Sequence, residues 1–456
     1  MQLSPITALS PLDGRYSKKT EELRPIVSEY ALIFYRLQIE IAWLETLAKN
    51  KDISEIAPLT KSEQAFLKKI LGDFNEKEAT KIKKIEHQTN HDVKAVEYYL
   101  REKCEMHKTL KRLSPWIHFA CTSEDINNLA YALMIKKTRD TILKPELENI
   151  ISQLNTFAHD TATFSMLSRT HGQAATPTTL GKEFKNFAVR LNTHYKQWMK
   201  IPITGKFNGA VGNFNAHVVA YPKVNWLRLS KQFVTSLGLE WNAYTTQIEP
   251  HDYLAQWLNA WNICNTILID LSRDIWGYIS LRYFTQKKLR NEVGSSTMPH
   301  KVNPIDFENA EGNLGICIAL ATHLSQKLPI SRWQRDLTDS TVLRNLGSIA
   351  GYAIVAYHAL LKGLSKLIPN HVLLKKELDT HWEVLAEPIQ MVMRKYGISD
   401  AYEQLKYFSR GEAITQKQIS QFIDDLSIPA SAKKQLQSLS PDNYIGLAIV
   451  LAKKSL

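Results

Sequence analysis

Cysteine is scarce in this sequence, which has four cysteines in 456 residues. Cys104, Cys121, Cys264 and Cys317 are widely spaced and form no C-x-x-C pair. This spacing argues against a zinc ribbon and against a disulfide framework. Reduced thiols fit a cytoplasmic protein best, and we predict that localisation.

Long hydrophobic runs are also missing. The most apolar stretch, from Ile349 to Leu361, is interrupted by Gly351 and His358 and is too short to span a bilayer. The segment Met1 to Pro5 lacks the basic residues and apolar core of a signal peptide. The sequence therefore predicts a soluble protein with no membrane partner.

Alternating strand patterns are rare, whereas helical spacing is frequent. Apolar residues between Leu254 and Ile279 repeat at intervals of three and four, and similar stretches follow Pro177, Pro304 and Thr338. Such helices are longer than the ~11–12-residue mean, so they should pack into a bundle and bury further faces in an oligomer. We predict an all-α fold with an N-terminal helical domain over residues 1–121, a central bundle of long helices over residues 122–365 and a C-terminal helical domain over residues 366–456.

Positive charge exceeds negative charge, with a net charge of +12 and a pI near 9.2. This excess fits either a nucleic-acid partner or an anionic small molecule. The basic clusters at residues 81–84 and 108–112 lie in helical surroundings of mixed charge, where a solvated surface is the simpler interpretation. No basic stripe with aromatic platforms is visible, which favours a small anionic substrate over nucleic acid.

Residues 294–304 read as a loop, because Pro299 and Pro304 lack backbone donors and restrict the residues before them. This loop carries the hydroxyls of Ser295 and Ser296, the cation of Lys301 and the amide of Asn303. Such groups can bind and activate a substrate that bears carboxylates. A polar surface connection is the alternative that local chemistry leaves open.

Two further polar stretches stand at expected helix starts. Residues 89–92 read Thr-Asn-His-Asp before a helical pattern, and helix N-termini favour anions. His87 and His91 are spaced to chelate a metal from one helix face, but no third ligand follows at a convincing spacing. Thr122 and Asp125 form the pattern of a capping box, so a helix should begin there.

Three loops complete the set of polar segments. Residues 168–173 should form a loop that leads into Thr176-Pro177 as the start of a long helix. Residues 205–217 are rich in glycine and asparagine but lack the P-loop pattern, so they read as a turn between antiparallel helices. Residues 332–344 concentrate cations and hydroxyls at the entry to the last long helix, although a charged interhelical loop has the same composition.

The stretch from Ser295 to Asn303, with Glu308 after it, resembles the signature of the fumarase/aspartase superfamily, whose members eliminate fumarate from a succinyl group. His300 between proline and lysine resembles the adenylosuccinate lyase branch. The resemblance extends to the Asp-Gly-Arg-Tyr turn at residues 13–16, to Arg-Thr-His-Gly-Gln at residues 169–173 and to residues 209–212. Ala174 departs from the pattern, since many relatives have proline there.

The resemblance implies cleavage of adenylosuccinate to AMP and of SAICAR to AICAR in purine biosynthesis, with Ser295 as the base and His171 as the acid. It implies no cofactor and no metal, and a homotetramer whose active sites are shared between subunits. Arg15 and Tyr16 are expected on the nucleotide phosphate, and Thr122 and Ser123 on a substrate carboxylate. The full set of expected substrate-binding residues is Arg15, Tyr16, Asn90, His91, Asp92, Thr122, Ser123, Gln247, Lys301, Val302, Asn303, Asn309, Arg335, Ser340, Thr341 and Arg344.

Three other hypotheses stay open from the sequence. The chain could be a different lyase of the superfamily, such as an argininosuccinate lyase, a fumarase or an aspartase. It could be a structural member that keeps the bundle without catalysis, or a basic protein that binds RNA or DNA. The presence of both Ser295 and His171 argues against the second hypothesis.

Overall fold

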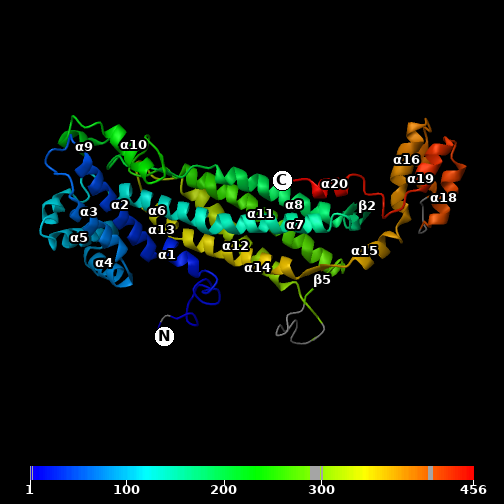
Figure 1. Ribbon diagram of the computed structural model, residues 1–456, viewed down its shortest axis with the longest axis horizontal. Helices are drawn as coiled ribbons and strands as arrows, with labels where there is room; N and C mark the ends of the chain where they lie inside the picture. The colour runs from blue at the N-terminus through cyan, green and yellow to red at the C-terminus, as the bar shows by residue number, and fades with distance from the viewer. Residues whose placement is uncertain (1, 3, 288–297, 299–300, 409–413, 456) are drawn as a thin grey trace. The chain divides into compact units, whose positions relative to one another are not determined.

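The structure is a computed structural model that describes residues 2, 4–287, 298, 301–408 and 414–455. It divides into two compact units, each assembled from three segments of the chain. The first unit comprises residues 1–147, 194–266 and 312–357, and the second comprises residues 148–193, 267–311 and 358–456. Helices dominate both units, and the described residues form only three two-stranded sheets, which confirms the all-α prediction (Figure 1).

The first unit is built around α2 (Glu29–Lys49), which packs against α5 (Asp92–Glu105) and α6 (Ser123–Thr138). Helix α2 has 21 residues and belongs to the predicted N-terminal helical region. No glycine or proline interrupts it, and the Ser28 side chain caps its start by accepting a hydrogen bond from the Ala31 N–H. The remaining short elements of this unit are η1 (Glu21–Leu23), α1 (Arg24–Val27), α3 (Lys61–Gly72), α4 (Glu76–Thr89), η2 (Leu110–Trp116), η3 (Arg139–Leu143), β3 (Thr204–Gly205), α9 (Asn215–Ala220), α10 (Trp226–Ser236), β4 (Glu240–Trp241) and α13 (Thr338–Leu343).

The predicted long helices are present. The longest, α11, has 29 residues and covers the periodic stretch from Leu254 to Ile279. The boundaries between the two units fall within all five of these helices. The long helices are α7 (Lys144–Asp160), α8 (Leu180–Met199), α11 (Asp252–Ser280), α12 (Ile305–Lys327) and α14 (Leu346–Lys366).

The helix predicted after Thr338 is interrupted. It forms α13, a break at Arg344 and Asn345, and then α14. The Asn345 side-chain amide donates to the carbonyl oxygens of Thr341 and Val342, both at 3.4 Å, and so satisfies the acceptors at the end of α13. The break places Arg344 at the C-terminus of α13 rather than within a helix.

The second unit contains a hairpin that the sequence did not predict. Strand β1 (Ser165–Thr170) pairs in antiparallel register with β2 (Gln173–Thr179). The helix expected to begin at Thr176-Pro177 therefore begins at Leu180, where the Thr179 hydroxyl accepts a hydrogen bond from the Lys182 N–H at 3.2 Å. Pairing with β1 overrides the local helix-start pattern, because each paired residue satisfies its backbone groups across the hairpin.

The C-terminal part of the second unit consists mainly of short helices. Gly397 has a φ of 82°, which suits the end of α16, and Pro429 precedes α19. The remaining elements of this unit are β5 (Phe284–Gln286), β6 (Leu367–Pro369), α15 (His371–Leu378), η4 (Trp382–Leu385), α16 (Ala386–Lys395), α17 (Ala401–Phe408), α18 (Gln416–Asp425), α19 (Ala430–Gln437) and α20 (Ala448–Lys453).

Over the part of the chain that the structure describes, no helix combines the length and the apolar character needed to cross a bilayer.

Candidate active site

The predicted segment at residues 89–92 connects two helices of the first unit. Asn90 ends α4 in the left-handed conformation, with φ 52°. His91 caps α5, and its Nδ1 accepts a hydrogen bond from the Lys94 N–H at 3.2 Å. Asp92 is the first residue of α5. The chain reverses between the two helices and presents three polar side chains, which confirms the predicted helix start.

Asp92 contacts two arginines from distant parts of the chain. Its Oδ2 lies 2.6 Å from Arg36 Nη2 and 3.2 Å from Arg344 Nη2. Burial alone raises the pKa of Asp92, but Arg36, assisted by Arg344, outweighs that effect and lowers the pKa below its usual range. Asp92 is therefore held as a carboxylate that orients both arginines.

Arg36 is a site residue that the sequence analysis did not find. Only 1% of its surface is exposed, and its Nε donates to Asn127 Oδ1 at 2.8 Å. A buried arginine requires compensating acceptors, which Asp92 and Asn127 provide. The sequence did contain a signal for it: Arg36 is a charged residue among the apolar residues Leu32, Ile33 and Leu37, which are buried on the same helix.

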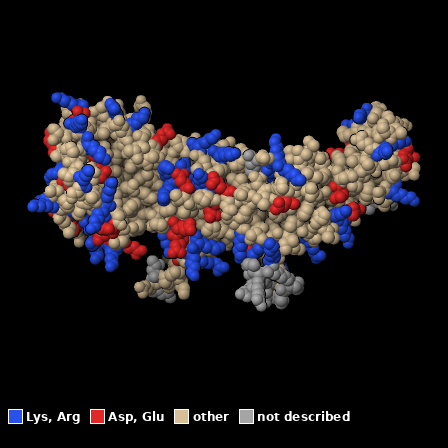
Figure 2. All heavy atoms as spheres, in the orientation of Figure 1, with Lys and Arg blue, Asp and Glu red and all other residues tan. Residues whose placement is uncertain are grey.

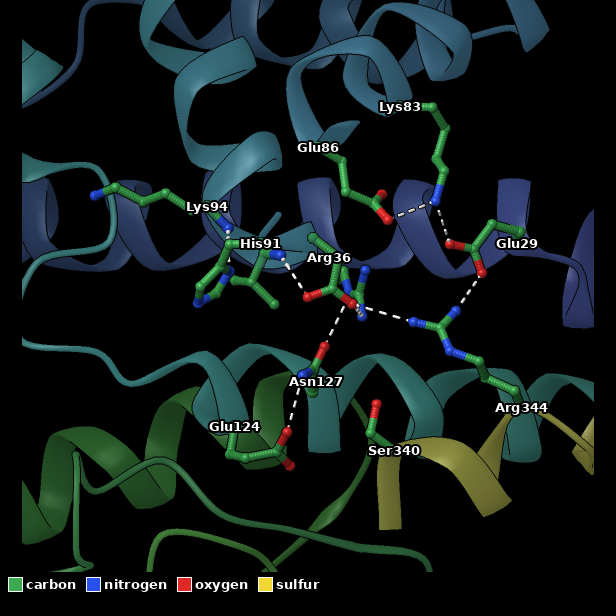
Figure 3. Close-up of polar contacts among 12 residues, drawn as sticks. Glu29, Arg36, Lys83, Glu86, His91, Lys94, Glu124, Asn127, Ser340 and Arg344 are labelled. Carbon is green, nitrogen blue, oxygen red and sulfur yellow. Dashed lines mark hydrogen bonds and ion pairs between the residues drawn. The ribbon is translucent and has the colours of Figure 1, made fainter. Parts of the chain in front are cut away.

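Arg335, in the same unit, is connected to Arg36 through Glu124 and Asn127. Its Nη2 lies 3.0 Å from Glu124 Oε1, and its Nη1 donates to Gln247 Oε1 at 3.3 Å. Glu124 is buried, which raises the pKa of its carboxyl despite the opposing effect of Arg335. Asn127 donates to the same Glu124 oxygen at 2.8 Å, so Asn127 links Glu124 to Arg36 (Figure 3).

Asp92, Asn127, Arg335 and Arg344 line a cavity of about 740 Å³ in the first unit, and their partners Arg36 and Glu124 lie outside its lining. The site residues predicted from sequence that line it come from three separate segments of the chain. They are Asn90, His91, Asp92, Ser123, Arg335, Ser340 and Arg344. Lys83, Glu86, His87, Asn127 and Leu337 complete the lining and were not predicted as substrate-binding residues. The lining includes the cations of Lys83, Arg335 and Arg344 beside the carboxylates of Glu86 and Asp92, and these cations suit an anionic ligand.

Thr122, Gln247 and Thr341 lie beside residues of this lining. Thr122 forms the predicted capping box of α6, and its N–H donates to Asp125 Oδ2 at 2.8 Å. Gln247 contacts Arg335, and Thr341 follows Ser340 on α13. Arg15 and Tyr16 lie in the predicted turn, where the Tyr16 N–H donates to the Pro11 carbonyl at 2.8 Å. Among the described residues, neither of these two lines the cavity.

A buried ion pair lies behind the N-terminus of α6. Lys206 Nζ is 3.0 Å from Asp125 Oδ1, and both side chains are fully buried. Asp125 also accepts hydrogen bonds from the N–H groups of Asn208 and Gly209. Asn208 in turn bonds Thr245, two residues before Gln247. Asp125 thus connects the segments that hold Thr122, Lys206 and Gln247.

The segment that leads into Thr122 is strained and firmly held. His118 and Ala120 both have a φ of 60°. His118 Nδ1 lies 2.6 Å from Glu40 Oε1, and the Trp43 indole donates to the Phe119 carbonyl at 3.0 Å. Burial lowers the pKa of His118, but Glu40 outweighs burial and raises it overall. Strained backbone that is held in place by surrounding contacts often occurs at functional sites.

The remaining predicted site residues belong to the second unit. His171 and Gly172 form the two-residue turn of the β1–β2 hairpin, with φ of 55° and 75°. His171 is exposed at the tip of this turn. Lys301, Val302 and Asn303 directly precede α12, and Asn309 is in its first turns. Ser295 lies outside the described residues.

The hairpin that carries His171 is tied to the C-terminal part of its own unit. Arg169 on β1 forms an ion pair with Glu377, and Glu377 also accepts a hydrogen bond from the Tyr283 hydroxyl. On β2, the Thr176 hydroxyl donates to Glu387. These contacts fix the two strands, so the turn presents the histidine from a rigid support.

The surface gives little support to nucleic-acid binding. On the face drawn in Figure 2, acidic side chains lie among the basic ones over several elements, and the coloured residues show no continuous basic stripe. His87 and His91, whose spacing suggested a metal site on one helix face, do not share a helix, because His87 lies on α4 and His91 caps α5. Within the described residues, no group of three or more His, Cys, Asp or Glu side chains could hold a metal ion.

Two protein-family models match this chain. Residues 14–318 match the model described as Lyase, and residues 331–445 match the model described as Adenylosuccinate lyase C-terminal. The adenylosuccinate lyase of Haemophilus influenzae is 55% identical over 454 residues, which cover 100% of each protein. That of Escherichia coli K12 is 54% identical over 451 residues, which cover 99% of each.

Solved structures show the same fold at much lower identity. A fumarate lyase from Mesorhizobium sp. BNC1 superimposes with a TM-score of 0.75 at 17% identity, covering 95% of this chain and 96% of that one. The 3-carboxy-cis,cis-muconate lactonizing enzyme from Pseudomonas putida gives a TM-score of 0.76 at 19% identity and covers 95% of each chain. At this level of identity the likeness concerns the fold alone.

Proposed function

Because the chain belongs to the adenylosuccinate lyase family of the fumarase/aspartase superfamily, we propose that it eliminates fumarate from adenylosuccinate, giving AMP. We propose the same reaction on SAICAR, giving AICAR, as a second step of purine biosynthesis. The observation that carries the proposal is the identity of 55% over the whole chain to a curated adenylosuccinate lyase. The polar cavity of the first unit supports it, because both substrates bear a phosphate and two carboxylates.

The elimination needs one base and one acid. The base removes a proton from the carbon beside a carboxylate, the C–N bond breaks, and its electron pair leaves with the nitrogen, which the acid protonates. We assign the base to Ser295, whose hydroxyl requires activation as the surrounding loop excludes water. We assign the acid to His171, because an imidazole with a pKa of about 6.5 in model peptides can donate a proton near neutral pH.

Negative charge grows on the substrate carboxylate while the proton is removed. Lys301 and Asn303 stand together before α12, and we assign them to this carboxylate. Preorganised donors of this kind often contribute several kcal/mol to transition-state stabilisation. Arg335 and Arg344, with Ser340, are assigned to the remaining anionic groups in the cavity. Arg15 and Tyr16 are assigned to the phosphate, and Val302, Asn309 and Thr341 to further substrate contacts.

The assigned residues that the structure describes come from both units. His171 and Lys301 belong to the second unit, whereas Ser123 and Arg335 belong to the first. We propose a homotetramer in which different subunits contribute these two sets. We further propose three domains, over residues 1–121, 122–365 and 366–456, and a cytoplasmic location, which suits the four free cysteines.

The first experiment is an assay of fumarate release from adenylosuccinate, with argininosuccinate, malate and aspartate as competing substrates. Fumarate from adenylosuccinate alone supports the proposal, and turnover of another substrate in its place contradicts it. Ser295→Ala and His171→Ala should each lower kcat by far more than tenfold while leaving the Kd for adenylosuccinate nearly unchanged, because the anion contacts remain. Turnover within about tenfold of wild type, or ~1.4 kcal/mol of barrier, would remove the proton-transfer role from that residue.

A further inference from the structure

One carboxylate in the first unit bridges two cations of the cavity lining. Glu29 is the first residue of α2, and its Oε1 lies 3.2 Å from Lys83 Nζ on α4. Its Oε2 forms an ion pair with Arg344 Nη1 at the end of α13. Figure 3 shows Glu29 between the two cationic side chains. A single anion therefore holds a lysine and an arginine from segments that are more than 250 residues apart in the chain.

The Glu29 contacts are much more exposed than the neighbouring Arg36–Asp92 pair. The side chains of Glu29, Lys83 and Arg344 are 39%, 42% and 39% exposed. The side chains of Arg36 and Asp92 are 2% and 25% exposed. Exposed ion pairs contribute little to stability because water and salt screen them. Glu29 can therefore exchange with another anion, whereas Asp92 stays fixed by Arg36.

The position of Glu29 also favours such an exchange. Lys83 and Arg344 line the cavity of about 740 Å³ together with Ser340. Glu29 lies outside that lining and borders a neighbouring cavity of about 360 Å³, which Arg344 also lines. This second space gives the Glu29 side chain room to turn away from both cations. Lys83 keeps its contact with Glu86 at 2.7 Å, and Arg344 keeps its contact with Asp92.

We propose that Lys83 and Arg344 form a two-cation site for an anionic group of the substrate, and that Glu29 holds these cations until that group replaces it. This inference rests on the proposed function, which supplies a phosphate and two carboxylates. A phosphate monoester carries a charge of about −1.5 to −2 at pH 7, so it competes well with a single carboxylate. Lys83 is then a substrate-binding residue in addition to those assigned from the family motifs.

The test uses two variants of the full-length enzyme, Lys83→Met and Glu29→Gln. Lys83→Met removes one cation, so KM for adenylosuccinate should rise about fivefold with little change in kcat. Glu29→Gln keeps the size of the side chain but removes the competing charge, so KM should fall about threefold. A residue that only fastens α4 to α2 would give neither change. An unchanged KM in Lys83→Met, or an unchanged or higher KM in Glu29→Gln, overturns the inference.

A second substrate identifies the anionic group. Succinyladenosine has both carboxylates but no phosphate. If Lys83 and Arg344 bind the phosphate, Lys83→Met should leave KM for succinyladenosine unchanged. If they bind a carboxylate, KM should rise by the same factor for both substrates. Either result supports the two-cation site and assigns its ligand.

Two controls keep the outcome interpretable. Lys81→Met removes a neighbouring lysine of α4 that pairs with Glu78 at 2.7 Å and does not line the cavity, so KM should stay at the wild-type value.

Calorimetric titration with inorganic phosphate and with succinate requires no turnover. If the wild type released no fumarate, the proposed function would fail, whereas tighter binding of one anion by Glu29→Gln would still support the site. Equal binding by wild type and both variants would overturn it.

Discussion

At the scale of single residues, the ion pair between Asp125 and Lys206 is the most deeply buried charge in the candidate site. A buried ion is tolerated only when partners replace its lost hydration. Asp125 meets this requirement with Lys206 and with the N–H groups of Thr122, Asn208 and Gly209. The pair therefore holds the Thr122–Ser123 segment in place, although it does not line the cavity itself.

Asp125→Asn should destabilise the protein and weaken substrate binding. It leaves the buried charge of Lys206 without a carboxylate partner, with only the Gly209 carbonyl oxygen as acceptor at 2.9 Å, at a cost of about 3–5 kcal/mol in the free energy of unfolding. Chemical denaturation measures this loss, and KM for adenylosuccinate should rise because Thr122 loses a charged acceptor. Asp140→Asn is the control, since the Asp140 side chain is 30% exposed in its pair with Lys136 and should cost below about 1 kcal/mol. Equal losses in the two variants would contradict the role given to Asp125.

His217 makes the stability of the protein sensitive to acid. It is 1% exposed, and neither ring nitrogen has a hydrogen-bond partner in the described part of the chain. Burial lowers the pKa of His217 to about 4. The unfolded chain, with a histidine pKa of about 6.5, binds more protons than the folded protein between these values. Stability therefore falls as the pH drops from 6.5 toward 4.

His217→Phe should remove this dependence. The new ring can pack against Phe214 and Trp226, which already contact the imidazole. The difference in the free energy of unfolding, variant minus wild type, should be about 2 kcal/mol larger at pH 5 than at pH 7.5. Urea denaturation at both pH values measures the change. A difference between wild type and variant that does not vary with pH would show that His217 does not titrate in this window.

At the scale of elements, the loop at residues 205–217 is defined by close backbone approach rather than by a ligand motif. Gly212 has a φ of 85°, and a Cβ atom there would lie 2.2 Å from the Thr245 carbonyl oxygen. Only glycine allows both this conformation and this contact. The loop can thus pack against the Thr245–Gln247 segment and help to position Gln247 beside Arg335.

Gly212→Ala should cost about 2–4 kcal/mol in unfolding free energy, because the backbone must move or remain strained. KM should rise as well, since the Gln247 segment moves with the loop. Gly72→Ala is a matched control at the end of α3, where an added Cβ meets no atom within 4 Å. That change should be neutral or should stabilise the helix by up to about 1 kcal/mol. Thermal melting of both variants gives the comparison.

At the scale of the whole molecule, the proposed active site needs residues from both compact units. His171 belongs to the second unit and Arg335 to the first. Long helices stand between the site motifs in the sequence. One of them, α11, has 29 residues, each of which adds a rise of about 1.5 Å. In the proposed homotetramer, different subunits contribute these two sets.

Mixing two inactive variants tests this arrangement. His171→Ala and Arg335→Ala should each be nearly inactive alone. After dissociation and reassembly together, they should recover activity well above that of either parent, because some sites then combine an intact His171 with an intact Arg335. Light scattering should report a tetramer in every active sample. No recovery in mixed tetramers, or full activity in a monomer, would contradict shared sites.

The sequence by itself determined the features that depend on neighbouring residues. Helical spacing predicted α8 and α11, and the Thr122–Asp125 pattern predicted the start of α6, because periodicity and capping act within a few residues. The matched motifs likewise indicated the lyase family, which the comparisons confirm. The residue roles carried over from the family stay predictions.

Only the tertiary structure decided which distant side chains meet. Arg36, Lys83 and Lys206 have no motif of their own, and their partners Asp92, Glu29 and Asp125 lie on other elements. Pairing with β1 likewise changed the expected helix start at Thr176-Pro177 into a strand. The physical reason is the same in each case: burial and pairing energies depend on contacts between segments that are far apart in the chain, and local sequence patterns do not contain those contacts.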